Sequence, residues 1–330
     1  MIRRSLFILF TGLLISNYSI GSETDQYLAL NKVIKDSTAK INHILKVKLN
    51  NAILKTNRRN RSCYKLTKTF MKEISVGKKT LMDVPLRNNK EIDQIPYHGS
   101  NKELFYDDSI FYGIKRFDLG NGDNRYLSPT FEINGVRLGG DKISHISYIG
   151  YSYYVTFYYY FKYFKKKFPL KVAKRKAIEK AINFGIFQEN SITGKSLLVA
   201  GLFSYADMEA NYQGLRLYYN ICQSTKPYVK KVNGKWSLQK EIDIRSYITP
   251  ELDETYYPNY YMTPFWIIVR ENLKKYCNKS SFKALQKRWR YYSTFKKKSF
   301  SYHYLKNKII KGELEDPSPF TLENVCYRTK

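Results

Sequence analysis

The residue with the clearest catalytic potential is Glu189, a carboxylate at the expected end of a helix. It stands in the segment 184–195, and an aromatic stretch, Gly201 to Ser204, follows soon afterwards. A carboxyl group held against aromatic side chains is partly desolvated, which raises its pKa and lets it act as a general acid at neutral pH. Glu189 is therefore a candidate general acid. The alternative is an ordinary solvent-exposed carboxylate, which is what most acids are.

Glycoside hydrolysis in its usual form needs a second carboxylate. Glu179 precedes Glu189 by ten residues, almost three turns of a continuous helix, so it is a candidate only if the helix is kinked at Gly185. Arg175 and Lys176 lie four and three positions before Glu179. Glu179 could equally form a surface ion pair with one of them.

Further candidates lie on the next expected helix, which starts near Ser204. Asp207 and Glu209 are two positions apart, so they cannot face the same way, and only one is expected to reach the site. Tyr205 could assist catalysis in place of a second acid. Ser204 and Asp207 could also do no more than cap the helix. The same helix carries two further polar candidates for substrate binding, Asn211 and Gln213.

The arrangement resembles the catalytic segment of goose-type lysozymes and lytic transglycosylases. In these families a helix ends in Glu-Ser and a Gly-Leu-aromatic or Gly-Leu-Met segment follows. Here Asn190 replaces the Ser, and no Gln follows Gly201-Leu202. A closer resemblance is to the deacetylation-specific lysozymes that predatory bacteria export. It rests on residues 185–190 and 203–214 and, with the neighbouring helices, covers at most a quarter of the chain.

The resemblance implies a lysozyme-like fold, Glu189 as the acid, and a peptidoglycan substrate whose glucosamine units have lost their acetyl groups. Such units carry free amines. Asp207 or Glu209 could pair with an ammonium group of this kind in the groove.

A second constellation begins with Asp141 and Lys142 and ends with His145. Asp141 and His145 are four apart and could touch on one helix face, which would fix the imidazole tautomer and leave its other nitrogen for a substrate. With four His in the chain and none nearby, no metal site is expected. The alternative is a capping Asp and a buried, hydrogen-bonded His.

Hydrophobic periodicity predicts the elements that position these residues. One or two amphipathic helices are expected over 24–57, and a short helix over 64–74. Turn-rich sequence follows, with a hairpin over 130–138. A long aromatic helix over 142–167, a helix over 171–189 and a third from 204 form the centre. A second hairpin, with Asn233-Gly234 as its turn, and helices over 265–276 and 282–295 complete the set, before a peripheral basic tail.

Composition restricts where the protein acts. Arg3 and Arg4 precede an apolar run from Leu6 to Ile15 and then small polar residues, the pattern of a cleavable signal peptide over 1–21. The chain has 57 basic and 28 acidic side chains, a net charge of +29. This excess favours polyanionic partners such as peptidoglycan or another anionic envelope polymer. Export argues against nucleic acid, and no transmembrane segment is expected after cleavage.

The four cysteines, at 63, 222, 277 and 326, show no zinc-site spacing, and the sequence does not choose among their three possible pairings. No phosphate-binding loop or other cofactor motif occurs, so no cofactor is expected. The predicted fold is mainly α (α+β, lysozyme-like), a helical core with a small β-hairpin and long loops. Residues 22–138 form an N-terminal helical and loop region, and 139–330 form the core that carries the site.

These expectations lead to two functions for a secreted or periplasmic protein. The first is a peptidoglycan glycan-strand hydrolase, a lysozyme-like glycosidase or lytic enzyme with Glu189 as its acid. The alternative is a non-catalytic, basic envelope protein that binds anionic cell-wall polymer or a protein partner.

Overall fold

The computed structural model describes residues 23–58, 62–75, 89–96, 107–114, 127–190 and 201–327. The predicted signal peptide lies outside these ranges. The described chain is mainly helical, as predicted, with short antiparallel two-stranded sheets. No helix within it is both long and apolar enough to cross a bilayer.

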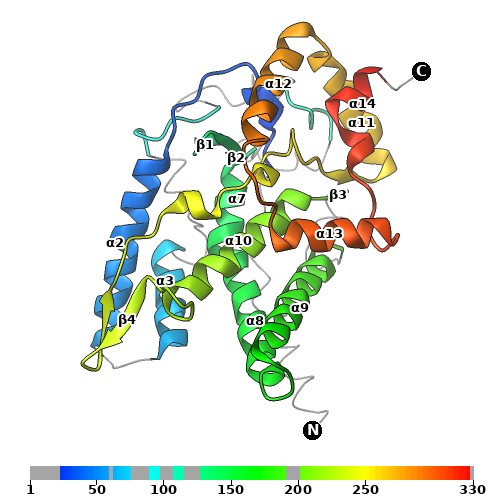
Figure 1. Ribbon diagram of the computed structural model, residues 1–330. Coiled ribbons are helices and arrows are strands. Elements are labelled where there is room, and N and C mark those ends of the chain that lie inside the picture. Colours follow the sequence, from blue (N-terminus) through cyan, green and yellow to red (C-terminus); the bar gives the residue numbers. More distant parts are fainter. Residues whose placement is uncertain are drawn as a thin grey trace.

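Four consecutive helical segments form the centre of the fold: α7 (Gly140–Ser144), a π-helical turn η2 (His145–Ile149), α8 (Gly150–Phe164) and α9 (Leu170–Asn190). α8 and α9 form an antiparallel pair, and α10 (Tyr205–Cys222) packs across α8 and η2 (Figure 1). Pro169 lies in the turn between α8 and α9. The long helix predicted over 142–167 is thus present, with a π turn inserted near its start.

Close backbone contact fixes the crossing of α8 and α10. A Cβ atom added to Gly150 would lie 2.5 Å from the Cα of Gly214, and one added to Gly214 would lie 2.2 Å from the carbonyl oxygen of Ile146. Because both residues at this crossing are glycines, the backbones of α8 and α10 come closer together than any larger side chain would allow.

The N-terminal part packs on this centre. A 3₁₀ turn η1 (Gln26–Ala29) precedes α2 (Thr38–Asn57) and α3 (Cys63–Ile74), and strands β1 (Thr130–Ile133) and β2 (Val136–Gly139) form the first predicted hairpin. The larger cluster of buried apolar side chains contains Leu45 of α2, Phe70 of α3, Phe131 of β1 and Tyr218 of α10. The core therefore continues across residue 139, the expected boundary between two regions.

The second hairpin, β4 (Val229–Val232) and β5 (Lys235–Leu238), is present with Asn233-Gly234 at its turn. Two 3₁₀ turns follow, η4 (Ile244–Tyr247) and η5 (Pro250–Leu252), and β3 (Leu202–Phe203) pairs with β6 (Tyr260–Tyr261). A second group of helices then forms, comprising α11 (Thr263–Leu273), η6 (Lys274–Tyr276), α12 (Lys279–Tyr292), α13 (Phe300–Ile310), η7 (Ser318–Phe320) and α14 (Leu322–Tyr327).

The prediction of a peripheral basic tail is wrong. α13 packs on α10 and buries Leu305 completely. α14 is tied to the end of η6 by the Cys277–Cys326 disulfide, and Cys63–Cys222 joins α3 to α10. Apolar side chains on one face of α13 hold the tail in the fold despite its many lysines.

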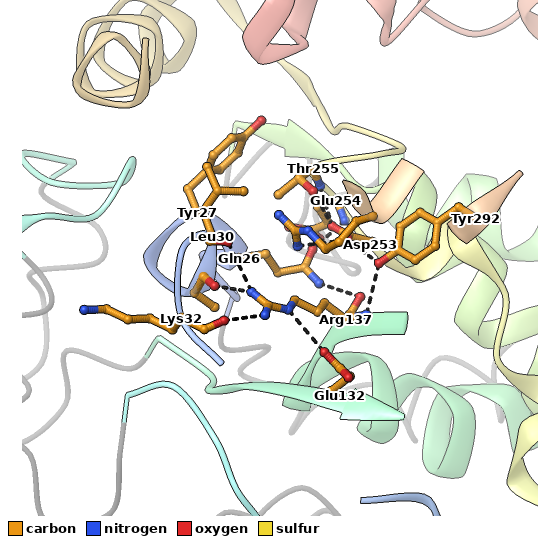
Figure 2. Close-up of polar contacts among 12 residues, drawn as sticks. Gln26, Tyr27, Leu30, Lys32, Glu132, Arg137, Asp253, Glu254, Thr255 and Tyr292 are labelled. Atoms are coloured by element: carbon orange, nitrogen blue, oxygen red, sulfur yellow. Dashed lines mark hydrogen bonds and ion pairs between the residues drawn. The ribbon is translucent and has the colours of Figure 1, made fainter. Parts of the chain in front are cut away.

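A buried arginine fixes the N-terminal segment and the loop after η5 to the first hairpin (Figure 2). The Arg137 guanidinium donates to the carbonyl oxygens of Ala29 and Lys32. Gln26 of the N-terminal segment joins β2 to the loop after η5. Its side-chain amide donates to the Arg137 carbonyl oxygen at 3.0 Å and accepts from the backbone N–H of Glu254. This network brings residues 23–26 and Glu254 to the start of α7.

Candidate functional site

A fully buried lysine lies where α7, α10 and the loop after η5 meet. The Lys142 Nζ atom is 2.6 Å from Asp141 Oδ2, 2.8 Å from Asp207 Oδ1 and 2.5 Å from Glu254 Oε1. Burial lowers the pKa of Lys142, but the surrounding carboxylates outweigh burial and raise it well above its usual value. The ammonium group is therefore charged and holds three segments of the chain together.

The start of α7 has a tightly packed backbone. A Cβ atom at Gly139 would lie 2.0 Å from both Asp141 Oδ1 and Thr24 Oγ1. The absence of a side chain at Gly139 lets the Thr24 hydroxyl donate to Asp141 Oδ1 at 2.6 Å. Asp141 therefore lies in the first turn of α7 between Thr24 and Lys142.

A fourth carboxyl group, that of Glu23, adjoins this cluster. Burial, followed by the charge of Asp207, raises the pKa of Glu23 well above its usual value. Burial likewise raises the pKa of Glu254 to about 7. Ligand atoms of Glu23, Asp141 and Glu254 lie within 4.8 Å of one another, a spacing that could hold a cation. The Lys142 ammonium already contacts two of the three, so we assign it as the cation of this cluster.

The predicted contact between Asp141 and His145 is wrong. His145 Nε2 lies 3.4 Å from Asp207 Oδ2, and Nδ1 lies 3.0 Å from Asn211 Oδ1. Thr24 and Lys142 engage the carboxylate of Asp141, and the imidazole faces α10 instead. Burial raises the pKa of Asp207, but His145 and then Lys142 outweigh it, so the net pKa of Asp207 is lowered.

The Tyr153 hydroxyl donates to Met208 Sδ at 3.3 Å and lies within electrostatic range of both Glu189 and Asp207. Burial raises the pKa of Tyr153 well above its usual value, and the charges of Glu189 and Asp207 raise it further. Gly185 makes room for the ring, because a Cβ atom there would lie 1.5 Å from the Tyr153 hydroxyl oxygen. α9 runs on through Gly185 without ending there.

Glu189 itself is 8 % exposed and lies one residue before the end of α9. The expectation that its carboxylate is shielded from water agrees with this burial. The next residue, Asn190, lines a pocket of about 270 Å³ together with three aromatic side chains, Phe203, Tyr205 and Tyr260, and the loop segment 312–315. Glu189 itself is not among the residues that line this pocket; it is the buried residue that precedes Asn190 at the end of α9.

Among the other predicted catalytic residues, Tyr205 lines this pocket and Glu179 does not. The Tyr205 hydroxyl donates to the carbonyl oxygen of Glu315. Glu179 accepts from Arg175 Nε at 2.9 Å in an i,i+4 pair on the surface of α9.

Asp207 and Glu209 face different surroundings, as their spacing predicts. Glu209 is buried and accepts from Gln213 at 2.5 Å, from Thr249 at 3.2 Å and from Ser299 at 2.6 Å. Burial raises the pKa of Glu209 to about 7. These contacts join α10 to η5 and α13. Asn211 instead lies beside His145, so the four polar residues of α10 divide between two buried networks.

Sequence reasoning did not select Lys142, Glu254 or Tyr153 as site residues. Lys142 stands next to Asp141 at the start of a helix that continues into a long aromatic run, and this was a usable signal for a buried charge, because such a charge must be paired. Glu254 lies in a Pro- and Tyr-rich loop far along the chain, where no local pattern indicates its partner.

Comparisons with protein-family models, with curated proteins and with solved structures find no match to this chain.

Proposed function

We propose that this protein is an exported peptidoglycan glycan-strand hydrolase of lysozyme-like type, with Glu189 as its general acid. The observation that carries the proposal is the position of a buried carboxyl group at the end of α9, directly before Asn190 of the aromatic pocket. A carboxyl group in apolar surroundings keeps its proton to higher pH and can transfer it to a glycosidic oxygen. Two disulfides are compatible with an exported location.

The pocket also suits an amino sugar. Phe203, Tyr205 and Tyr260 provide apolar surface, and a few polar groups beside such surface orient a ligand. Glu313 and Glu315 of the lining are exposed acids in a strongly basic protein. Glu313 pairs with Lys308, whereas Glu315 has no ion pair within the described chain. The Glu315 carboxylate can therefore pair with the free amine of a deacetylated glucosamine unit.

In the proposed reaction Glu189 protonates the oxygen of the scissile bond as the bond to the sugar C1 breaks. Water or a hydroxyl group of the sugar then attacks C1 and gives its proton to the Glu189 carboxylate, which restores the acid for the next cycle. Tyr205 lines the same pocket, and in this proposal its ring contacts the sugar. Catalytic contacts commonly tighten only when substrate is bound, so the side chain of Glu189 has to reach the pocket in the complex.

The test is digestion of purified peptidoglycan by the mature protein, with product masses determined for fully acetylated and for enzymatically deacetylated material. We expect glycan fragments to be released from the deacetylated material. The masses of the fragments distinguish hydrolysis from lytic formation of an anhydro sugar. Glu315→Gln is expected to raise KM for the deacetylated substrate while leaving kcat nearly unchanged, because the residue binds the amine without touching the reacting bond. Absence of glycan fragments from both materials would refute the proposed activity.

A further inference from the structure

The turn between α8 and α9 presents apolar and basic side chains together on one exposed end of the molecule. Leu170 is 68 % exposed and Tyr163 is 52 % exposed, and Phe168 and Val172 are exposed as well. The turn lies at the end of the molecule opposite α12 and α14 (Figure 1). We define these four residues with Lys165, Lys166 and Lys167 as the hairpin tip.

Charge around the hairpin tip is almost entirely positive. Nine lysine and arginine side chains stand between residues 159 and 180, against one acid, Glu179. Arg175 already pairs with that acid. Lys165, Lys166 and Lys167 are all exposed. Some of the lysines lie over aromatic rings, with Lys167 Nζ 4.5 Å from the centroid of Tyr163.

We propose that the hairpin tip is a membrane-docking surface that inserts its apolar side chains into the interface of an anionic phospholipid bilayer. Aromatic and aliphatic side chains at a helix turn can enter the headgroup region, and the long lysine side chains reach back to the phosphates. Lipid is favoured over a soluble polyanion because a polyanion would satisfy the lysines but leave Phe168 and Leu170 in water. This surface lies on the α8–α9 turn, whereas the proposed active site lies at the other end of α9. A failure of membrane binding would therefore leave the proposed hydrolase activity unaffected, and loss of that activity would leave membrane binding unaffected.

Sedimentation with vesicles of phosphatidylglycerol and phosphatidylcholine tests the proposal on the full mature chain. Wild type is expected to bind the anionic vesicles and not vesicles of phosphatidylcholine alone. Each lysine near an anionic surface contributes roughly fivefold to binding, so changing Lys165, Lys166 and Lys167 together to Gln is expected to weaken binding by about a hundredfold. Changing Phe168 and Leu170 together to Ser is expected to weaken binding at least about tenfold at unchanged charge.

The β4–β5 hairpin offers a matched control. It carries three exposed lysines, Lys230, Lys231 and Lys235, beside Val232, which is 49 % exposed. Changing these lysines to Gln removes the same charge, and Val232→Ser removes one exposed apolar side chain from the same hairpin. Both control variants are expected to bind the anionic vesicles within about twofold of wild type, because only the hairpin tip contacts the bilayer.

A Trp at position 170 reports insertion directly. The Leu170→Trp variant is expected to show a blue-shifted emission with anionic vesicles and quenching by lipids brominated on their acyl chains, beyond any change in wild type. Three results would overturn the proposal: equal loss of binding in the β4–β5 variants, unchanged binding after the Phe168 and Leu170 substitutions, or binding to soluble polyphosphate with none to anionic vesicles. The last result would identify a polymer partner in place of lipid.

Discussion

Lys142 and Asp207 join α7 to α10 through an ion pair in which Nζ and Oδ1 are 2.8 Å apart and the lysine side chain is inaccessible to solvent. The same ammonium group contacts Glu254, which follows η5, and therefore connects parts of the chain that share no local sequence pattern. A charge in this position is costly to bury but more costly to leave unpaired.

Replacing Lys142 with Met is expected to destabilise the protein strongly. The substitution removes the positive charge and leaves Asp141, Asp207 and Glu254 buried together, which costs about 3 to 5 kcal/mol for a broken buried pair. Urea unfolding followed by circular dichroism measures the change. Lys46→Met is the control, because Lys46 pairs with Glu241 at 2.6 Å on the surface, and such pairs contribute less than about 1 kcal/mol. Equal losses in the two variants would contradict the assignment of Lys142 as the central cation.

Glu209 is expected to make stability depend on pH. Burial raises the pKa of its carboxyl group from 4.5 to about 7. The folded state therefore binds more protons than the unfolded state between these pH values, and the free energy of unfolding falls as pH rises through this window. Across this window the raised pKa of Glu209 lowers the free energy of unfolding by on the order of 3 kcal/mol.

Glu209→Gln removes this titration. The free energy of unfolding of the variant, relative to wild type, is expected to rise between pH 5 and pH 8. The same substitution at Glu179, a half-buried residue on α9, is measured alongside as the control. Urea titrations at both pH values measure this difference. A constant difference between Glu209→Gln and wild type would show that Glu209 titrates in the folded protein as it does in the unfolded chain.

The Cys277–Cys326 disulfide is expected to anchor α14. The two cysteines are 49 residues apart, and a loop of this length predicts a loss of about 4 kcal/mol when the bond is removed. Unfolding of the variant with both cysteines changed to Ala measures the loss. A thiol assay on the native wild-type protein is the companion measurement, and detection of four reactive thiols would refute both disulfides.

Local sequence signals predicted much of the framework. Asn233-Gly234 indicated the second hairpin, and Ser204 indicated the start of α10, whose N-cap hydroxyl accepts from the backbone N–H of Asp207. The spacing of Asp207 and Glu209 predicted that they would face different ways. These features depend on neighbours in sequence, which is why pattern and capping rules find them.

The contacts that assemble the candidate site depend on distant residues. Glu254 reaches Lys142 because Arg137 and Gln26 hold the loop after η5 against the first hairpin. The Asp141 to His145 spacing suggested a local pair, but Asp141 is bound by Thr24 from the N-terminal segment. Periodicity along one helix contains no information about such partners, so a single sequence could not identify them.

The most direct test of the account is the rate at which soluble glycan fragments are released from deacetylated peptidoglycan by Glu189→Gln compared with Glu179→Gln. Both variants carry the same substitution on α9, and Glu179 is held in a surface pair with Arg175. We predict that Glu189→Gln lowers the rate by at least about a hundredfold, the usual contribution of a general acid, while Glu179→Gln stays within about twofold of wild type. Equal rates for the two folded variants would contradict the role of Glu189.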